Sequence, residues 1–355
     1  MARAMRFVVA QTSFLGDVVL STPVFAALKR RWPDCHLTAW VRPEGAAVLA
    51  GHPHVDAILL DDKRGADNGL RGFRRVYGRV RNGQFDVAVA LHKSLRTALL
   101  LAMARVPRRI GFRQSAGWFL YHQRVVRDAT QHDAQRNLSI VSALGIDPVC
   151  EPAHLLLLPS PEADARLKDL LRQHGVPTGS PLIGVAPGSV WATKRWTVEG
   201  FATLTAALHQ RGHQVLLLGA PSEQVIAAEV NRRAGGIAID LVGHTDIGML
   251  VAAISRCRVL VCNDSAPMHI AVARDVPVVV IFGPTHPSMG YGPFTQRATV
   301  VQRDDLTCRP CSRHGTERCP IDTHECMTGI SANTVLAAVQ PFFEDSGGEA
   351  RMATP

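Results

Sequence analysis

Asp17 is the first residue whose type and position suggest chemistry. A strand-like apolar stretch, Phe7–Ala10, is followed by a polar loop and then by Gly16 and Asp17. Glycine permits a tight turn, so we expect Asp17 at a helix entrance beyond the carboxyl end of the strand. A carboxylate there could act as a general base on an acceptor hydroxyl. It could equally be a helix cap, because aspartate is favoured in the first turn of a helix.

Lys194 is a second candidate and follows a strand in the later half of the chain. The strand leads into a Gly/Ser turn ahead of a helix, in the sequence Pro187-Gly188-Ser189-Val190-Trp191-Ala192-Thr193-Lys194-Arg195-Trp196. Amides in such a turn can bind phosphate, which makes Ser189 a candidate ligand. Lys194 could neutralise a diphosphate leaving group. The alternative is a solvated surface lysine, since the spacing is not that of a P-loop, and no dinucleotide fingerprint precedes Asp17.

Two further strand ends carry polar groups. The strand predicted at Val259–Asn263 ends in Asp264 and Ser265, and His269 follows on the first turn of a helix. Ser265 and the amides at the helix start could face an anion. Glu223, after another strand, could accept hydrogen bonds from nucleoside hydroxyls. The alternatives are that Asp264 is an N-cap, His269 a surface histidine and Glu223 a favourable helix start.

Apolar runs alternate with helical patterns, which predicts an α/β fold built from right-handed strand–helix–strand units. The predicted strands are Arg6–Gln11, His36–Arg42, Ala57–Leu60, Asp86–His92, Arg109–Phe112, Leu182–Ala186, Gln214–Gly219, Ile239–Val242, Val259–Asn263 and Val276–Phe282. The predicted helices are Pro23–Arg31, Gly69–Arg81, Ser94–Ala104, Ala163–His174, Val198–Arg211, Glu223–Ala234, Ile247–Arg256, Pro267–Arg274 and Ala332–Phe343.

A proline-rich stretch interrupts the alternation and divides the chain. We expect one Rossmann-like domain over residues 1–160, a connector over 161–181 and a second Rossmann-like domain over 182–330. Ligands of doubly wound sheets bind beyond the carboxyl ends of the strands, so two such domains should face a central cleft. The last segment, 331–355, holds a helix that we expect to cross the domain boundary and a tail.

The composition indicates a globular chain with an anionic partner. The length of 355 residues suits two domains, and 46% of the residues are hydrophobic. The net charge of +9 favours nucleic acid, a phosphorylated metabolite or an anionic membrane surface. We expect no nucleic acid, because no nucleic-acid-binding module is recognisable. Without an export signal or a run of about 18 apolar residues, the protein is expected in the cytoplasm.

Half of the eight cysteines cluster late in the chain. A Cys-x-x-Cys pair followed by two further thiols could hold a structural zinc or iron ion. Free thiols or a redox-sensitive pair are the alternatives, because the spacing is not that of a standard zinc finger, and disulfides are not expected without export. The cluster comprises Cys308, Cys311, Cys319 and Cys326, with His314 and His324 as additional candidate ligands.

These segments together resemble the lipopolysaccharide heptosyltransferase family, glycosyltransferase family 9. The resemblance extends from Arg6 to the final helix, and the cysteines are similar to those of its type II branch. It rests on Ser13-Phe14-Leu15-Gly16-Asp17-Val18-Val19-Leu20-Ser21-Thr22-Pro23, Lys194-Arg195-Trp196, Leu217-Leu218-Gly219-Ala220-Pro221, Asn263-Asp264-Ser265-Ala266-Pro267-Met268-His269 and Phe282-Gly283-Pro284-Thr285.

The resemblance implies a GT-B fold and an inverting transfer of heptose from ADP-heptose, with no cofactor required for catalysis. The first domain would then bind the acceptor, and the second, with its Cys-rich loop 308–326, the nucleotide sugar. Asp17 matches the family's proposed base and Lys194 its leaving-group contact. Some members carry Thr-Gly where this chain has Ser265-Ala266, which puts the tight-turn role of Ala266 in doubt. The residues that match the donor site are Ser189, Glu223, Asp264, Ser265, Ala266 and His269.

The acceptor implied by the resemblance is the lipopolysaccharide inner core, lipid A-Kdo-heptose. Lys93, Arg96 and Arg113, with Arg108 and Arg109 nearby, could bind its phosphate and carboxylate groups; the alternative is a solvated basic helix face. The net charge also suits peripheral binding to the cytoplasmic face of the inner membrane.

Two other functions remain open at this point. One is a related transferase that uses another nucleotide sugar or another acceptor, including a protein. The other, suggested by the basic charge, is a non-enzymatic protein that binds nucleotides or nucleic acid.

Overall fold

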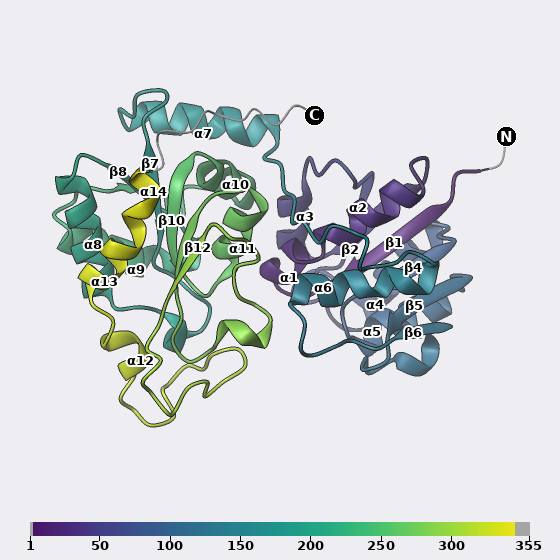
Figure 1. Cartoon of the computed structure of the whole chain (residues 1–355). Coiled ribbons are helices and arrows are strands. Elements are labelled where there is room, and N and C mark those ends of the chain that lie inside the picture. Colours follow the sequence, from purple (N-terminus) through teal and green to yellow (C-terminus); the bar gives the residue numbers. More distant parts are fainter. Residues whose placement is uncertain (1–2, 345–355) are drawn as a thin grey trace. The chain divides into compact units, whose positions relative to one another are not determined.

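The computed structural model describes residues 3–344, which form two compact units (Figure 1). The first unit holds the chain up to Asp164 and two later segments, Ile247–Ala252 and Ser288–Phe294. The second unit holds the remainder. The division passes through helices α7 (Pro161–Gln173) and α10 (Ile247–Ser255) and the short turn η5 (Pro287–Met289).

The first unit is built on a six-stranded parallel sheet of order β3-β2-β1-β4-β5-β6. Every neighbouring pair is parallel, which requires helical crossovers between strands. The strands are β1 (Arg6–Gln11), β2 (His36–Val41), β3 (Ala57–Leu60), β4 (Val87–Ala90), β5 (Arg108–Phe112) and β6 (Gln123–Val125). The helices are α1 (Leu15–Val19), α2 (Thr22–Arg31), α3 (Pro43–Leu49), α4 (Gly69–Asn82), α5 (Leu95–Met103) and α6 (Asp133–Leu138), with 3₁₀ turns η1 (Trp118–Leu120) and η2 (Ser139–Leu144).

The second unit repeats this topology. Its parallel sheet has the order β12-β11-β10-β7-β8-β9, which is the same doubly wound order read from the other edge. The strands are β7 (Leu182–Ala186), β8 (Gln214–Leu217), β9 (Ile239–Asp240), β10 (Cys257–Asn263), β11 (Val278–Ile281) and β12 (Ala298–Val301). The helices are α8 (Val198–Gln210), α9 (Gln224–Arg233), α11 (Ala266–Ala273), α12 (Glu325–Thr328), α13 (Ala332–Val339) and α14 (Pro341–Glu344), with 3₁₀ turns η3 (Ala192–Lys194) and η4 (Pro221–Glu223).

Topology fixes where ligands can bind in each unit. Strand order reverses between β1 and β4 in the first sheet and between β7 and β10 in the second. The crevice beyond the carboxyl ends of such strands is the usual binding place of a doubly wound sheet. Asp17 follows β1, and Ser189 and Asp264 follow β7 and β10, so three of the predicted site residues lie beside these two points.

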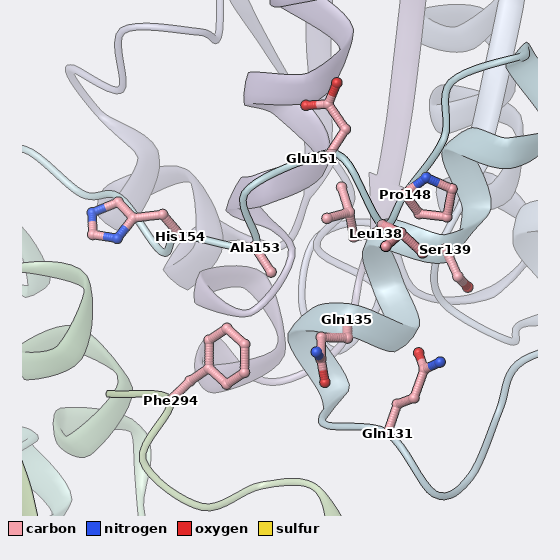
Figure 2. Close-up of a pocket in the computed structure, with 10 residues that line it drawn as sticks. Gln131, Gln135, Leu138, Ser139, Pro148, Glu151, Ala153, His154 and Phe294 are labelled. Carbon is pink, nitrogen blue, oxygen red and sulfur yellow. The ribbon is translucent and has the colours of Figure 1, made fainter. Parts of the chain in front are cut away.

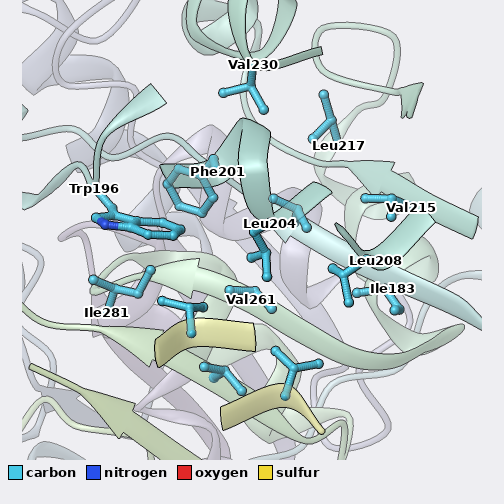
Figure 3. Close-up of a cluster of buried hydrophobic side chains, with 14 of the residues drawn as sticks. Ile183, Trp196, Phe201, Leu204, Leu208, Val215, Leu217, Val230, Val261 and Ile281 are labelled. Carbon is cyan, nitrogen blue, oxygen red and sulfur yellow. The ribbon is translucent and has the colours of Figure 1, made fainter. Parts of the chain in front are cut away.

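Both cores are aliphatic and cover the two faces of each sheet. Strand β4 reads Val-Ala-Val-Ala and β11 reads Val-Val-Val-Ile, and every residue of both is buried. Continuous apolar strands of this kind belong to parallel sheets with helices on both faces. In the second core, the Trp196 and Phe201 rings meet edge to face at 4.9 Å, and Trp196 Nε1 donates to Ile330 O at 3.1 Å (Figure 3). Trp196 therefore fastens the segment after Lys194 to the core.

The α/β class, the paired Rossmann-like units and the ten predicted strands are confirmed. The edge strands β6 and β12 were not predicted, because their side chains are only partly buried and lack a long apolar run. The short helices α1, α3 and α6 were also missed. Val335 and Val339 of α13 lie in the second core; that the last segment crosses the domain boundary remains a prediction, and its residues 345–355 lie outside the described chain. No helix within residues 3–344 is long and apolar enough to cross a membrane.

Candidate active site

Asp17 lies in the short helix α1, directly after the loop that follows β1. Ser13 Oγ donates a hydrogen bond to Asp17 Oδ2 at 2.6 Å, and the Phe14 amide donates to the same oxygen at 3.2 Å. Asp17 thus does cap the start of α1. Both hydrogen bonds from the described residues go to Oδ2, so Oδ1 is the carboxylate oxygen that is available to take a proton.

The surroundings of Asp17 make it a stronger base than an ordinary aspartate. Burial raises the pKa of this carboxyl, and the nearby Asp133 carboxylate raises it further. Hydrogen bonds from Ser13 and Phe14 and the positive charge of Arg127 lower the pKa of Asp17 but do not cancel the effect of burial. A carboxylate with a raised pKa holds a transferred proton better, as a general base requires.

A buried charge cluster lies next to Asp17. The Asp133 side chain is 2% exposed and pairs with Arg127 and with Arg136. The later segment Ser288–Phe294 packs on the same helix, because Gly290 O accepts from the Asp133 amide at 2.8 Å and Met289 O from Arg136 at 3.1 Å. Sequence analysis missed this cluster and the return of the later chain to the first unit.

A group of cations near the carboxyl ends of β1, β3 and β4 joins the predicted Arg96 to Lys63, Arg42 and Arg64, which no sequence pattern singled out. Lys63 Nζ donates to Thr12 O at 2.6 Å, and burial lowers the pKa of Lys63, with Arg42, Arg64 and Arg96 adding to the effect and Asp61 opposing it. Burial likewise lowers the pKa of His92 to about 4, so this imidazole is neutral at physiological pH. Lys63 closely follows a predicted strand, and that position was the available signal.

The predicted acceptor residues have different surroundings. Arg96 forms an ion pair of 3.2 Å with Asp61, whose side chain is 1% exposed, and also donates to Asp67 O. Lys93 and Arg113 are exposed, Lys93 directly before α5 and Arg113 directly after β5. Arg96 therefore helps to hold the loop after β3, whereas Lys93 and Arg113 lie on the surface.

In the second unit, the main polar contact joins two predicted residues. Lys194 Nζ lies 2.6 Å from Asp264 Oδ2, and the two side chains are 13% and 6% exposed. Thr285 Oγ1 donates to the same oxygen at 2.7 Å. The ion pair links the turn after β7, the end of β10 and the loop after β11. It holds the Lys194 ammonium group in place, whereas the ammonium group of a solvated surface lysine would be free to move.

Asn263, the last residue of β10, holds the predicted phosphate turn. Its Nδ2 donates to Pro187 O at 2.9 Å and to Gly188 O at 3.2 Å, and its Oδ1 accepts from the Trp196 amide at 2.9 Å. Ser189 is buried, and its carbonyl accepts from Arg195 Nε at 2.8 Å. One buried amide side chain therefore supports both ends of the loop that carries Lys194.

Glu223 lies beneath this turn. A Cβ atom on Gly188 would overlap the Glu223 carboxyl group, so the glycine lets this carboxyl group lie directly against the turn. Glu223 Oε2 accepts from the Ala220 amide at 2.8 Å. Burial raises the pKa of Glu223, although this hydrogen bond and Arg195 act in the opposite direction.

The start of α11 differs slightly from expectation. Ser265 occupies the N-cap position, but its hydroxyl donates to Asn263 O at 3.2 Å and makes no capping bond. Ala266 is the first helical residue, and His269 is buried, so the alternative of a surface histidine is wrong. Asp264 is followed directly by Ser265 and Ala266, and His269 lies in the first turns of the same helix. These three residues are therefore close to the Lys194–Asp264 pair in the sequence.

The Cys-rich loop supports Lys194. Thr193 Oγ1 donates to Thr316 O at 2.7 Å, and Thr193 O lies 2.8 Å from His324 Nε2. The Cys311 amide donates to Pro284 O at 3.0 Å, next to Thr285. The loop therefore contacts both segments that meet at Asp264.

The expected metal site at the cysteines is not supported. Within residues 3–344, no group of three or more His, Cys, Asp or Glu side chains is gathered to hold a metal ion. All eight cysteines are free thiols; Cys308 and Cys311 are exposed, whereas Cys326 is buried. Burial raises the pKa of Cys326 to about 11, which disfavours the thiolate that a metal needs. The hydrogen bonds of the loop indicate a packing role.

Two sizeable pockets of the described chain lie away from these residues. One, of about 580 Å³, is in the first unit, between α6, the loop Pro148–His154 and Phe294 (Figure 2). The other, of about 660 Å³, lies in the second unit at the amino ends of β7 and β10. That is the opposite sheet edge from Ser189 and Asp264. None of the predicted site residues lines either pocket.

Comparison with known proteins places the chain in a family. The model of "Glycosyltransferase family 9 (heptosyltransferase)" matches residues 73–321. Lipopolysaccharide heptosyltransferase 2 of Salmonella typhimurium is 29% identical over 313 residues, which cover 84% of this chain and 88% of that protein.

Two solved structures have the same fold. A glycosyltransferase of family 9 from Veillonella parvula has a TM-score of 0.85 at 25% identity, and covers 98% of this chain and 99% of its own. The ADP-heptose lipopolysaccharide heptosyltransferase II of Escherichia coli has a TM-score of 0.79 at 22% identity, and covers 97% and 100%. The predicted GT-B class is thus confirmed.

The buried Lys194–Asp264 pair makes a prediction about stability. Lys194→Met leaves the Asp264 carboxylate buried without its cation. We therefore expect the free energy of unfolding of the second unit to fall by about 3 kcal/mol. Adding Asp264→Asn, which keeps an acceptor for Thr285, should restore most of that loss. Denaturant unfolding measures both variants.

The matched control is Arg172→Met, which breaks the exposed pair with Asp169 and should cost less than about 1 kcal/mol. A double variant no more stable than Lys194→Met would contradict the ion-pair account.

Proposed function

This chain belongs to glycosyltransferase family 9, the heptosyltransferase family, and on that premise we propose that it transfers a heptose from ADP-heptose to the inner core of lipopolysaccharide. The observation that carries the proposal is the pair of residues at the two sheet reversals, Asp17 in the first unit and Lys194 with Asp264 in the second. The relatives named for ADP-heptose and lipopolysaccharide support this donor and this acceptor.

In the proposed reaction, Asp17 is the general base. It takes the proton from an acceptor hydroxyl through Oδ1 while Ser13 and Phe14 hold Oδ2. The deprotonated oxygen attacks the anomeric carbon, and the bond between that carbon and the ADP phosphate breaks on the opposite face. This displacement inverts the configuration at the anomeric carbon.

The departing ADP needs compensation for its negative charge. Lys194 carries the cation, and its pairing with Asp264 holds it in one place before the donor arrives, so little reorganisation is needed in the reaction. We place the diphosphate at Lys194 and at the amides of Ser189 and of the α11 start at Ser265–Ala266, with His269 nearby. Glu223 would accept from nucleoside hydroxyls. No metal or other cofactor takes part in this scheme.

The acceptor would bind in the first unit. Lys93 and Arg113 supply exposed cations for the phosphate and carboxylate groups of the inner core, while Arg96 holds the loop after β3 through its ion pair with Asp61. Lys63, whose ammonium group donates to Thr12 O in the loop after β1, adds a cation that no sequence pattern singled out. We place the enzyme in the cytoplasm, at the cytoplasmic face of the inner membrane, where such an acceptor is lipid-anchored.

Release of ADP tests the function directly. Purified protein incubated with ADP-heptose and heptose-truncated lipopolysaccharide should release ADP well above a control without acceptor. ADP-, UDP- and GDP-hexoses serve as donor controls. Release no higher than the control, or a clear preference for one of these hexose donors, would contradict the proposal.

Replacement of the base should separate chemistry from binding. Asp17→Asn removes the proton acceptor but keeps the shape and a hydrogen-bond acceptor for Ser13, so transfer should fall by about 100-fold or more. The Kd for ADP-heptose should stay within about twofold. Full activity in Asp17→Asn would remove Asp17 from the mechanism.

The pH profile should report the hydrogen bond of Ser13. The raised pKa of Asp17 places the acid limb of kcat/KM above the range of an ordinary aspartate, because the base works only when ionised. Ser13→Ala removes a hydrogen bond that favours the ionised form, so the acid limb should move to still higher pH. Ser142→Ala removes an exposed hydroxyl that donates to the Ser139 carbonyl, and it should leave the acid limb unchanged. An acid limb unmoved in Ser13→Ala would contradict the assignment.

A further inference from the structure

Helix α5 of the first unit exposes an apolar stripe. Leu95, Leu99 and Met103 are spaced four residues apart and therefore lie on one side of the helix. Their exposed fractions are 41%, 36% and 51%. The opposite side, with Thr97, Ala98, Leu100 and Leu101, packs into the core. The exposed side accordingly has no role in holding the sheet together.

The turn η1 extends this stripe with two aromatic rings. Trp118 and Phe119 are 45% and 58% exposed, and their rings meet edge to face at 6.1 Å. Gly117 packs so closely on α5 that a Cβ atom there would overlap Ala98. The same Cβ atom would lie 3.4 Å from Leu95 Cδ1, so η1 packs beside Leu95, at one end of the exposed side of α5.

Arg109 holds η1 in its projecting position. Its Nε donates to Leu120 O at 2.9 Å and its Nη1 to Val106 O at 2.8 Å. The guanidinium thus ties the turn to the loop that follows α5. Trp118 and Phe119 are presented on a fixed piece of backbone, which lowers the entropy lost when they insert into a partner.

We call the surface of Leu95, Leu99, Met103, Trp118 and Phe119 the α5–η1 face. It contains five of the sixteen large apolar side chains that residues 3–344 expose. The remainder are spread over the rest of the described chain. Apolar side chains gathered on one surface indicate an interaction site, whereas scattered ones do not.

The charge around the α5–η1 face identifies the kind of partner. Residues 87–127 contain no aspartate or glutamate but eight lysines and arginines. Arg124 lies over the Trp118 ring at 5.1 Å, and Arg105 is exposed at the end of α5. An apolar surface with an exposed tryptophan and flanking exposed arginines fits the boundary between lipid headgroups and acyl chains of an anionic bilayer.

We propose that the α5–η1 face docks the enzyme on anionic phospholipid membranes. Phe119 and Met103 insert among the acyl chains, Trp118 lies at headgroup depth, and Arg105 and Arg124 contact lipid phosphates. The biological use of this docking rests on the proposed function, because it brings the unit that carries Asp17 to a lipid-anchored acceptor. Binding to lipid itself does not depend on that function.

Vesicle sedimentation tests the docking. The full chain should bind vesicles of phosphatidylcholine and phosphatidylglycerol, and bind phosphatidylcholine alone at least about tenfold more weakly. Met103→Gln with Phe119→Ser, and separately Arg105→Gln with Arg124→Gln, should each weaken binding to the mixed vesicles by about tenfold or more. The matched control is Leu70→Gln, an 85% exposed leucine on α4, which should change binding by less than about twofold.

Trp118 gives a direct and independent readout. Brominated phospholipids in the mixed vesicles should quench the fluorescence of the wild-type chain, and Trp118→Phe should abolish most of this quenching while still binding vesicles. Equal quenching in Trp118→Phe would mean that another surface enters the membrane and would overturn the proposal. Unchanged vesicle binding by both double variants would also overturn the proposal. So would a wild type that binds no vesicles but forms a dimer, if the double variants are monomeric.

Transfer to a water-soluble acceptor separates this proposal from the function. With de-acylated core oligosaccharide, the Met103→Gln/Phe119→Ser variant should keep wild-type kcat/KM, which also shows that it is folded. If the wild type binds vesicles but transfers no heptose to this soluble acceptor, the proposed function alone is refuted. Intact transfer with no vesicle binding by the wild type would refute the docking alone.

Discussion

The second unit is organised around one buried ion pair. Lys194 and Asp264 come from segments 70 residues apart and would each be costly to bury alone. Their contact depends on β7 and β10 being neighbours and on Asn263, which holds both ends of the loop that carries Lys194. Thr285 and, through Thr193, the Cys-rich loop complete the surroundings. The arrangement holds the Lys194 ammonium group in place beside the carboxyl end of a parallel sheet, where we propose that it meets the anionic leaving group.

The first unit applies the opposite electrostatic strategy at the same topological position. Here a carboxylate, Asp17, lies among groups that partly destabilise its charge, with Asp133 opposing ionisation and Ser13, Phe14 and Arg127 favouring it. Burial makes the largest contribution to the raised pKa of Asp17, which is the property that the proposed general base requires. The surrounding unit is rich in cations, and its α5–η1 face adds exposed apolar groups. An acceptor that carries negative charge and a lipid anchor suits both features.

Sequence patterns predicted what depends on local order. Asp17, Ser189, Glu223 and Asp264 were predicted as site residues because each closely follows an apolar strand, and parallel sheets bring such positions to one edge. The Lys194–Asp264 pairing could not be predicted, since nothing local relates residues so far apart. The same holds for Arg127 with Asp133 and for the return of Ser288–Phe294 to the first unit. The metal prediction at the cysteines is not supported by the described residues, and the spacing could not reveal that the loop packs through Thr316 and His324.

The central claim is that this chain joins a heptose to a lipopolysaccharide core, with a base in one unit and a leaving-group cation in the other. The most direct measurement is mass spectrometry and NMR of the acceptor after incubation with ADP-heptose and the purified protein. The account predicts a gain of one heptose residue, joined with inverted anomeric configuration. An acceptor of unchanged mass, or a product with retained configuration, would contradict it.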